Sequence, residues 1–172
     1  EQVLASVIEN NKNKPVKIRS TNGVLVNGVV DVNVRFSRCC SPVPGDEIVG
    51  FITRGRGISI HRTDCVNVIA LPESEKSRLV DVEWQQESFH SNEKFMAEIK
   101  IFCNNRIGIF ADISKIFTER EIDIASMSSK TSKQGTATIN MSFEVGGVDA
   151  LQQLINRLMA VNSVIDIERS NG

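Results

Sequence analysis

The chain has 172 residues, 41% of them hydrophobic and 24% charged, and a formal net charge of −1. This ordinary balance excludes a disordered or fibrous protein, and near neutrality argues against binding nucleic acid through bulk charge. The length suits two small domains. No apolar run approaches the ~18 residues of a membrane span, and four cysteines are too few for a dense disulfide framework. A cytosolic protein with reduced thiols and no membrane partner is therefore expected.

Residues 1–15 are expected to form a trailing helix and linker from a longer protein. The apolar run over residues 3–9 is too short to hold a helix alone, and the breaker cluster that follows it ends in Pro15. The chain also begins with Glu1 instead of Met, which favours a piece of something larger.

Residues 16–72 predict a small, mostly β module that contains three of the cysteines. Short apolar runs alternate with turn residues, and the period of two places Val34 and Phe36 on one face of a strand. The predicted strands cover residues 24–26, 32–36, 48–52 and 58–61. The polar stretch 73–92 is expected to be a linker with one short strand over residues 80–84.

Residues 93–172 predict a second domain with a clear β-α-β-β-α-β order. Apolar residues alternate in the strands and recur at helical spacing between them. The predicted strands are 95–103, one opened by Ile122 and Ile124, 137–145 and 164–167, and the predicted helices are 109–119 and 148–159. This order is typical of a ferredoxin-like sandwich, so the expected fold class is α+β.

Four soft ligands, Cys39, Cys40, His61 and Cys65, lie within one short segment and predict a zinc site. Adjacent cysteines argue against it, because neighbouring side chains in an extended strand point to opposite faces, although a bend after Cys40 would relieve this. Two alternatives stay open. Cys39 or Cys40 packs in a core as a small hydrophobe, or a thiol acts as a nucleophile activated by His61 and Arg38.

Arginines are concentrated in the first half of the chain, around the loop Arg54-Gly55-Arg56-Gly57. Glycines there permit close backbone approach, and guanidinium groups bind phosphates well. A solvated hairpin tip explains the same residues equally well. In the second domain, the turn from Asn104 to Gly108 precedes a helix, whose free N–H groups suit a carboxylate ligand. A plain helix cap is the alternative there.

Residues 34–65 closely resemble the conserved-cysteine region of long bacterial Rel/SpoT-family (p)ppGpp synthetase/hydrolases, and residues 93–172 resemble the ACT domain that closes those proteins. The resemblance implies a non-catalytic C-terminal regulatory region of a GTP pyrophosphokinase or (p)ppGpp hydrolase in the stringent response, relaying ribosome state to upstream catalytic domains of the same chain. It also implies a ribosome-intersubunit, or zinc-finger, domain that contacts ribosomal RNA. The residues expected to do so are Arg35, Arg38, Arg54, Arg56 and Arg62.

ACT domains often bind amino acids at an Asp-Arg-x-Gly turn, commonly between paired subunits, so the resemblance implies a branched-chain amino acid and a homodimer as partners. Here the turn reads Asn105-Arg106-Ile107-Gly108, which replaces the Asp and removes a charge that would hold an ammonium group. The residues expected around the ligand are Asn104, Asn105, Arg106, Ile107, Gly108, Ile109, Ile122 and Ile124.

Overall fold

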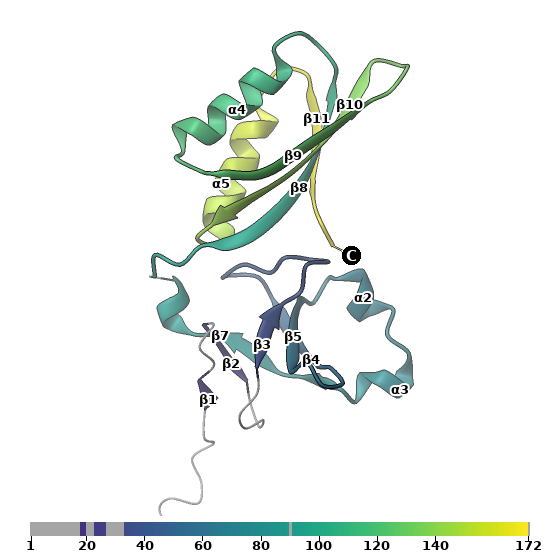
Figure 1. The fold of residues 1–172 in the computed structure, drawn as a ribbon, viewed down its shortest axis with the longest axis vertical. Helices are drawn as coiled ribbons and strands as arrows, with labels where there is room; N and C mark the ends of the chain where they lie inside the picture. Colours follow the sequence, from purple (N-terminus) through teal and green to yellow (C-terminus); the bar gives the residue numbers. More distant parts are fainter. Residues whose placement is uncertain (1–17, 20–22, 27–32, 90, 172) are drawn as a thin grey trace, which may run out of the picture.

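The computed structural model describes residues 18–19, 23–26, 33–89 and 91–171. The expected helix over residues 1–15 lies outside these residues. The chain forms two stacked modules (Figure 1), the cysteine module over the described residues up to 89 and the second module over residues 91–171. Within the described residues, every helix is too short or too polar to cross a membrane.

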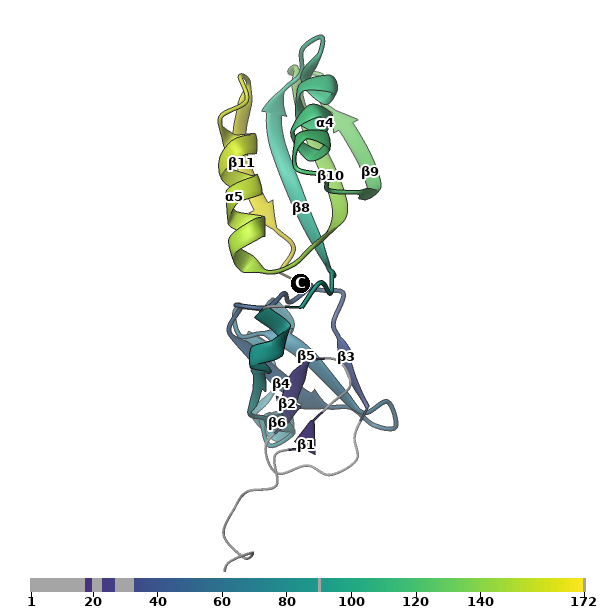
Figure 2. The same ribbon diagram turned by 90° about the vertical axis from the view of Figure 1, so that its left-hand side faces the viewer.

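The second module is the predicted ferredoxin-like sandwich. Its strands pair antiparallel in the order β11-β8-β10-β9, and both helices cover one face of this sheet (Figure 2). The elements are β8 (Phe95–Asn104), α4 (Ile109–Glu119), β9 (Ile124–Thr131), β10 (Thr136–Val145), α5 (Val148–Met159) and β11 (Val164–Arg169). The α+β fold class is thus confirmed.

Alternation along the strands builds the core of the second module. In β8, Phe95 and every second residue after it face the helices and are buried, whereas the residues between them lie on the open face of the sheet. Helices α4 and α5 supply Ile113 and Leu154, both fully buried, to the same core. The helical and strand periods of the sequence therefore meet at one continuous apolar layer.

The cysteine module contains two small sheets and a smaller core. Sheet order is β1-β2-β7 in one and β3-β5-β4-β6 in the other, with β3 and β5 parallel. The strands are β1 (Ile18–Arg19), β2 (Val24–Val26), β3 (Val34–Phe36), β4 (Ile48–Ile52), β5 (Ile58–Arg62), β6 (Leu79–Val80) and β7 (Val82–Trp84). Helices α2 (Val66–Ile69) and α3 (Glu73–Lys76) and the 3-10 turn η1 (Gln86–Phe89) complete it.

The expected linker over residues 73–92 differs from the structure. Instead of one strand, its apolar residues form two very short strands that belong to different sheets, since β6 pairs with β4 and β7 pairs with β2. Strands of two or three residues have too little sequence pattern to be recognised locally. The pairing also places the Trp84 ring in the core between the modules.

The two modules meet along a docking segment, residues 41–46, which follows the adjacent cysteines. Its first four residues are buried, and Val43 packs in the core of the second module. An aromatic cluster closes the junction beside it: the Phe36 and Trp84 rings stack with centroids 5.5 Å apart, and Phe95 of β8 meets both edge-on. The C-terminal end of the chain also lies between the modules (Figures 1 and 2).

Candidate functional site

The adjacent cysteines lie in a turn and not in a strand. The backbone N–H of Ser41 donates to the Ser37 carbonyl at 3.0 Å, which closes a loop around Cys39 and Cys40. Ser41 has a positive φ of 44°, so the chain bends sharply directly after Cys40. The turn brings both thiols to the same side, and the objection to adjacent ligands does not hold here.

Two neighbouring elements supply the other ligand atoms. His61 lies near the end of β5, and Cys65 lies directly before α2. The Cys39 sulfur is 3.4 Å from His61 Nδ1, 3.6 Å from the Cys65 sulfur and 4.0 Å from the Cys40 sulfur. The Cys40 sulfur is 3.8 Å from His61 Nδ1. All four ligand atoms lie within 4.8 Å of one another.

These separations fit a tetrahedral zinc site. With Zn–S near 2.3 Å and Zn–N near 2.0 Å, the edges of a regular tetrahedron are ~3.8 Å between sulfurs and ~3.5 Å between sulfur and nitrogen. The donor set, three thiols and one imidazole, is also one that structural zinc prefers. The four predicted ligands are therefore brought together in an arrangement that can hold one ion.

The histidine is oriented by hydroxyl groups on its far side. His61 Nε2 lies 2.9 Å from Ser37 Oγ and 3.2 Å from Ser59 Oγ, so Nδ1 faces the thiols. A proton on Nε2 leaves the Nδ1 lone pair directed at the cluster, which is the state that a metal ligand needs. The backbone N–H of Arg62 donates to the Cys40 sulfur at 3.3 Å and would stabilise a thiolate there.

The thiol environment argues against the nucleophile interpretation. Burial raises the pKa of Cys40 to about 12, helped by the neighbouring Cys39 and Cys65, and burial also raises the pKa of Cys65. Burial lowers the pKa of His61, which disfavours an imidazolium that would activate a thiol. A bound cation reverses this balance by binding the thiolate form, so the cluster suits a metal better than a free nucleophile.

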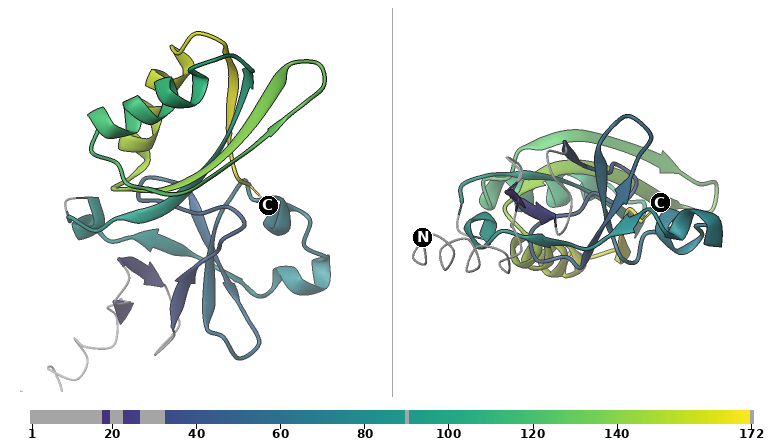
Figure 3. Two further views of the ribbon diagram at one scale, coloured as in Figure 1. Left: turned by 45° about the horizontal axis from the view of Figure 1, so that its top comes forward. Right: turned by 90° about the horizontal axis from the view of Figure 1, so that it is seen from below.

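The five arginines expected to contact RNA do not converge. Arg54 and Arg56 lie at the tip of the β4–β5 hairpin, at the end of the cysteine module away from the second module (Figure 3), and both are exposed. Arg35 is exposed on β3 opposite Ser59. Arg38 is exposed next to the cysteines, at the other end of the module. Among the expected contacts, Arg54 and Arg56 share the hairpin tip, whereas Arg35 and Arg38 lie on other segments.

The position of Arg62 differs from the expectation that it contacts RNA. It is 6% exposed, and its guanidinium donates to both carboxylate oxygens of Asp64 at 2.9 and 2.7 Å. Although burial, the largest influence, lowers the pKa of Arg62, the hydrogen bond and charge of Asp64 outweigh it and raise that pKa. The residue is thus a buried structural cation that is unavailable to a phosphate. Arg62 continues the inward-facing register of Ile58 and Ile60 along β5, but the strand predicted from the sequence ended at residue 61 and left it out.

The turn expected to bind an amino acid is braced by its own arginine. Arg106 donates to Asp112 Oδ2 at 2.7 Å, to the Asn162 carbonyl at 2.9 Å and to Ser163 Oγ at 3.1 Å. Asn104 and Asn105 are exposed beside it, and Ile107 is fully exposed. Gly108 caps α4, whereas Ile109 is completely buried and cannot touch a surface ligand without rearrangement.

Ile122 and Ile124 lie at the opposite end of α4 from this turn. Ile124 pairs with Phe143, whereas Asn104 pairs with Thr136 at the other end of the sheet. The intervening helix of 11 residues is about 16 Å long. The predicted ligand residues therefore form two separate groups within one chain, and Ile122 instead lines a cavity of about 230 Å³ with Lys94 and Arg120.

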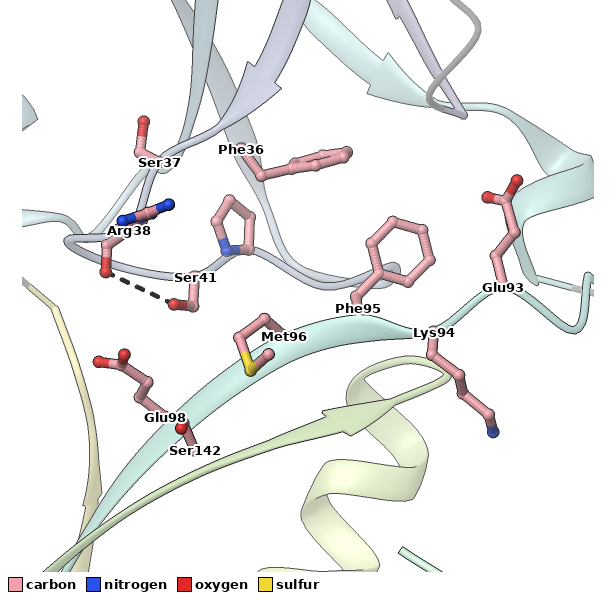
Figure 4. Close-up of a pocket in the computed structure, with 11 residues that line it drawn as sticks. Phe36, Ser37, Arg38, Ser41, Glu93, Lys94, Phe95, Met96, Glu98 and Ser142 are labelled. Atoms are coloured by element: carbon pink, nitrogen blue, oxygen red, sulfur yellow. Dashed lines mark hydrogen bonds between the residues drawn. The ribbon is translucent and has the colours of Figure 1, made fainter. Parts of the chain in front are cut away.

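A larger cavity of about 780 Å³ opens at the junction of the modules, and no sequence pattern indicated it. Figure 4 shows Phe36, Phe95 and Met96 around its apolar part, with Arg38 and Glu98 together at one side. The docking segment forms one wall, and the Ser41 hydroxyl donates to the Arg38 carbonyl at 3.5 Å. The cavity therefore exists only while the modules are docked.

Comparison with known proteins agrees with both modules. The model of the RelA/SpoT RIS domain matches residues 24–85, and the model of the ACT domain matches residues 91–169. A GTP pyrophosphokinase of Streptomyces coelicolor is 37% identical over 86% of this chain, and one of Escherichia coli strain K12 is 37% identical over 87% of it. The chain spans only 17% and 20% of the lengths of these two relatives.

A solved ACT domain, that of the GTP pyrophosphokinase of Chlorobium tepidum, is 26% identical and has a TM-score of 0.41, covering 45% of this chain and 99% of its own. The two domain models occur in the order that the fold shows, and the relatives align across both modules. The chain therefore belongs to the RelA/SpoT family, as a C-terminal regulatory region in which a RIS domain is followed by an ACT domain.

Proposed function

We propose that this chain is the non-catalytic part of a GTP pyrophosphokinase or (p)ppGpp hydrolase that docks on ribosomal RNA in the cytoplasm and relays ribosome state to catalytic domains elsewhere in the protein. Membership of the RelA/SpoT family supports a regulatory role in the stringent response. The observation that carries the RNA contact is the hairpin tip, where Arg54, with a side chain 83% exposed, lies close in sequence to exposed Arg56.

Charge distribution supports a local contact. Because the net charge is −1, attraction to phosphates must come from a restricted surface. The carboxylate of Glu75 lies 3.5 Å from the exposed Arg54 guanidinium and also pairs with Arg78, so Arg54 is held weakly and can exchange this partner for a phosphate. The tip also projects away from the second module, so docking of the modules leaves it open to a partner.

Zinc at Cys39, Cys40, His61 and Cys65 is the second part of the proposal. The tetrahedral separations support it, and the metal would supply structural cross-linking between the cysteine turn, β5 and α2 without taking part in chemistry. Metal analysis of the purified protein tests this directly, with one zinc per chain expected and none contradicting the site.

The RNA contact is tested with the double variant Arg54→Ala/Arg56→Ala in a ribosome filter-binding assay. Affinity should fall, and the dependence of log affinity on log salt should become shallower by about one unit for each phosphate that the variant no longer binds. The matched control is Lys130→Ala/Lys133→Ala, which removes the same charge from exposed positions of the second module. Equal affinities for the two variants would remove the hairpin tip from the interface.

Amino-acid sensing is not part of this proposal. Asn105 lacks the charge that would hold an ammonium group, Arg106 is engaged by Asp112, and Ile122 lies at the far end of α4. Calorimetric titration with valine, leucine and isoleucine examines the alternative, and heat at sub-millimolar ligand would restore it.

A further inference from the structure

The cysteine turn and the docking segment are one continuous stretch of chain, residues 37–46. Cys39 and Cys40 lie in its first half, and the buried residues that enter the junction lie in its second half. Pro42 and Pro44 fix φ angles within the docking segment, directly after the thiols. A displacement of the two cysteines should therefore also displace the docking segment.

The C-terminal tail of the second module forms hydrogen bonds with the first half of this stretch. Ser170 Oγ donates to the Cys39 carbonyl at 3.0 Å, and Arg169 donates to the Ser41 carbonyl at 3.3 Å. Buried Arg62 joins the two sides, since one of its nitrogens lies 3.2 Å from both the Cys40 carbonyl and the Ser170 carbonyl. The backbone of both adjacent cysteines is thus held by residues outside the ligand set.

The second half of the stretch is fixed by the body of the second module. The Val148 N–H, at the start of α5, donates to the Pro44 carbonyl at 2.8 Å. Arg169 forms a bidentate pair with Asp46 at 2.8 and 2.9 Å, with little exposure of either side chain. Gly45 has a φ of 103°, and a Cβ there would lie 2.4 Å from Val148 Cγ1, so the Gly45 backbone packs closely against the Val148 side chain.

We propose that metal binding at the cysteine cluster and docking of the second module are thermodynamically coupled, with Ser170 and Arg62 as positioning residues that hold the cysteine turn in its metal-binding shape. This inference rests on the zinc site proposed above. A metal fixes Cys39 and Cys40 against His61 and Cys65, which holds the turn where the tail can bind it. By reciprocity, a docked tail raises metal affinity by the same factor.

The first test compares zinc affinity, by chelator competition, between the unmodified chain and Ser170→Ala. Loss of the hydrogen bond to the Cys39 carbonyl should weaken zinc binding about tenfold, the lower end of the range for residues that orient metal ligands. The control is Ser129→Ala, an exposed position on β9, which is separated from β11 by two strands. Its zinc affinity should equal that of the unmodified chain.

The second test measures docking itself by amide hydrogen exchange. When zinc is removed by a chelator, exchange of the Val148 N–H should accelerate, because its acceptor, Pro44, lies in the other module. The Leu151 N–H is the internal control, since it donates to Gly147 within the same module and should keep its protection.

The outcomes separate the two proposals. A chain that binds no zinc overturns the metal site and the coupling together. Zinc bound equally by Ser170→Ala and the unmodified chain, or an unchanged exchange rate at Val148 after chelation, overturns the coupling and leaves the metal site standing.

Discussion

The two modules reach stability by different routes. The second module buries a continuous apolar core between four strands and two helices. In the described residues of the cysteine module, the corresponding apolar cluster consists of Val24, Val26, Val34, Ile58 and Ile60. A core so small rarely stabilises a domain without a metal, a disulfide or a partner. The cysteine module therefore has little apolar packing of its own, and we expect it to depend on its ligand cluster and on docking, whereas the second module is stabilised by its own core.

The largest expected effect on stability comes from loss of a metal ligand, and it should be confined to the cysteine module. Cys40→Ala removes one of four ligands, and structural zinc contributes on the order of 10–16 kcal/mol to small peptides. We expect the cysteine module to lose its cooperative unfolding transition, which is monitored by Trp84 fluorescence. The second module should keep its far-ultraviolet circular dichroism signal.

Cys103→Ala is the matched control, because Cys103 is also fully buried but lies in β8. It should retain zinc and the Trp84 transition. If both cysteine variants lose that transition to the same extent, the dependence on the ligand cluster is wrong.

Removal of a core side chain from the second module should have the opposite result, destabilising that module and leaving the cysteine module intact. Leu154 is fully buried in α5, and Leu154→Ala should cost about 2–5 kcal/mol through lost burial and the cavity left behind. Thermal denaturation measures this cost, and zinc content should stay at one per chain. Met159→Ala, on the same helix but 41% exposed, should change stability far less. Equal costs would show that α5 packs differently from the structure.

The smallest expected effect concerns the hairpin tip. A Cβ at Gly57 would lie 2.1 Å from the Asn33 carbonyl oxygen, and φ there is 75°. Gly57→Ala should therefore cost the cysteine module about 1–3 kcal/mol. Gly55→Ala shares the positive φ but meets nothing within 4 Å, so the difference between the two variants in urea denaturation isolates the clash. No difference would mean that the tip is free to move away from Asn33.

The fold of the second module was predictable because its signals are local. Alternation from Phe95 along β8 and the helical spacing from Ile109 each extend over ten or more residues, and these patterns state which face is buried. The length of the predicted helix already separated Ile122 from Asn105. The resemblance to ACT domains nevertheless led to the prediction that both residues surround one ligand.

The candidate site was predictable in its members but not in its shape. Ligand types and spacing identified Cys39 and His61, whereas the turn that unites the adjacent thiols depends on the Ser37–Ser41 hydrogen bond. The partner of Arg62 at the Ser170 carbonyl lies 108 residues away in the sequence, and no local pattern can reveal that contact. Non-local pairing also assigned β6 and β7 to separate sheets.

The junction also has a consequence for the order of folding. Ser170 meets Cys39 across 131 residues, and Arg169 meets Asp46 across 123. Contacts so distant in sequence have a large entropic cost of loop closure. This cost falls as each module becomes compact. During synthesis, the cysteine turn must wait for the last strand to leave the ribosome before its carbonyls are bound. Docking therefore supports the cysteine turn only after β11 has been synthesised, so the cysteine module gains this support late in folding.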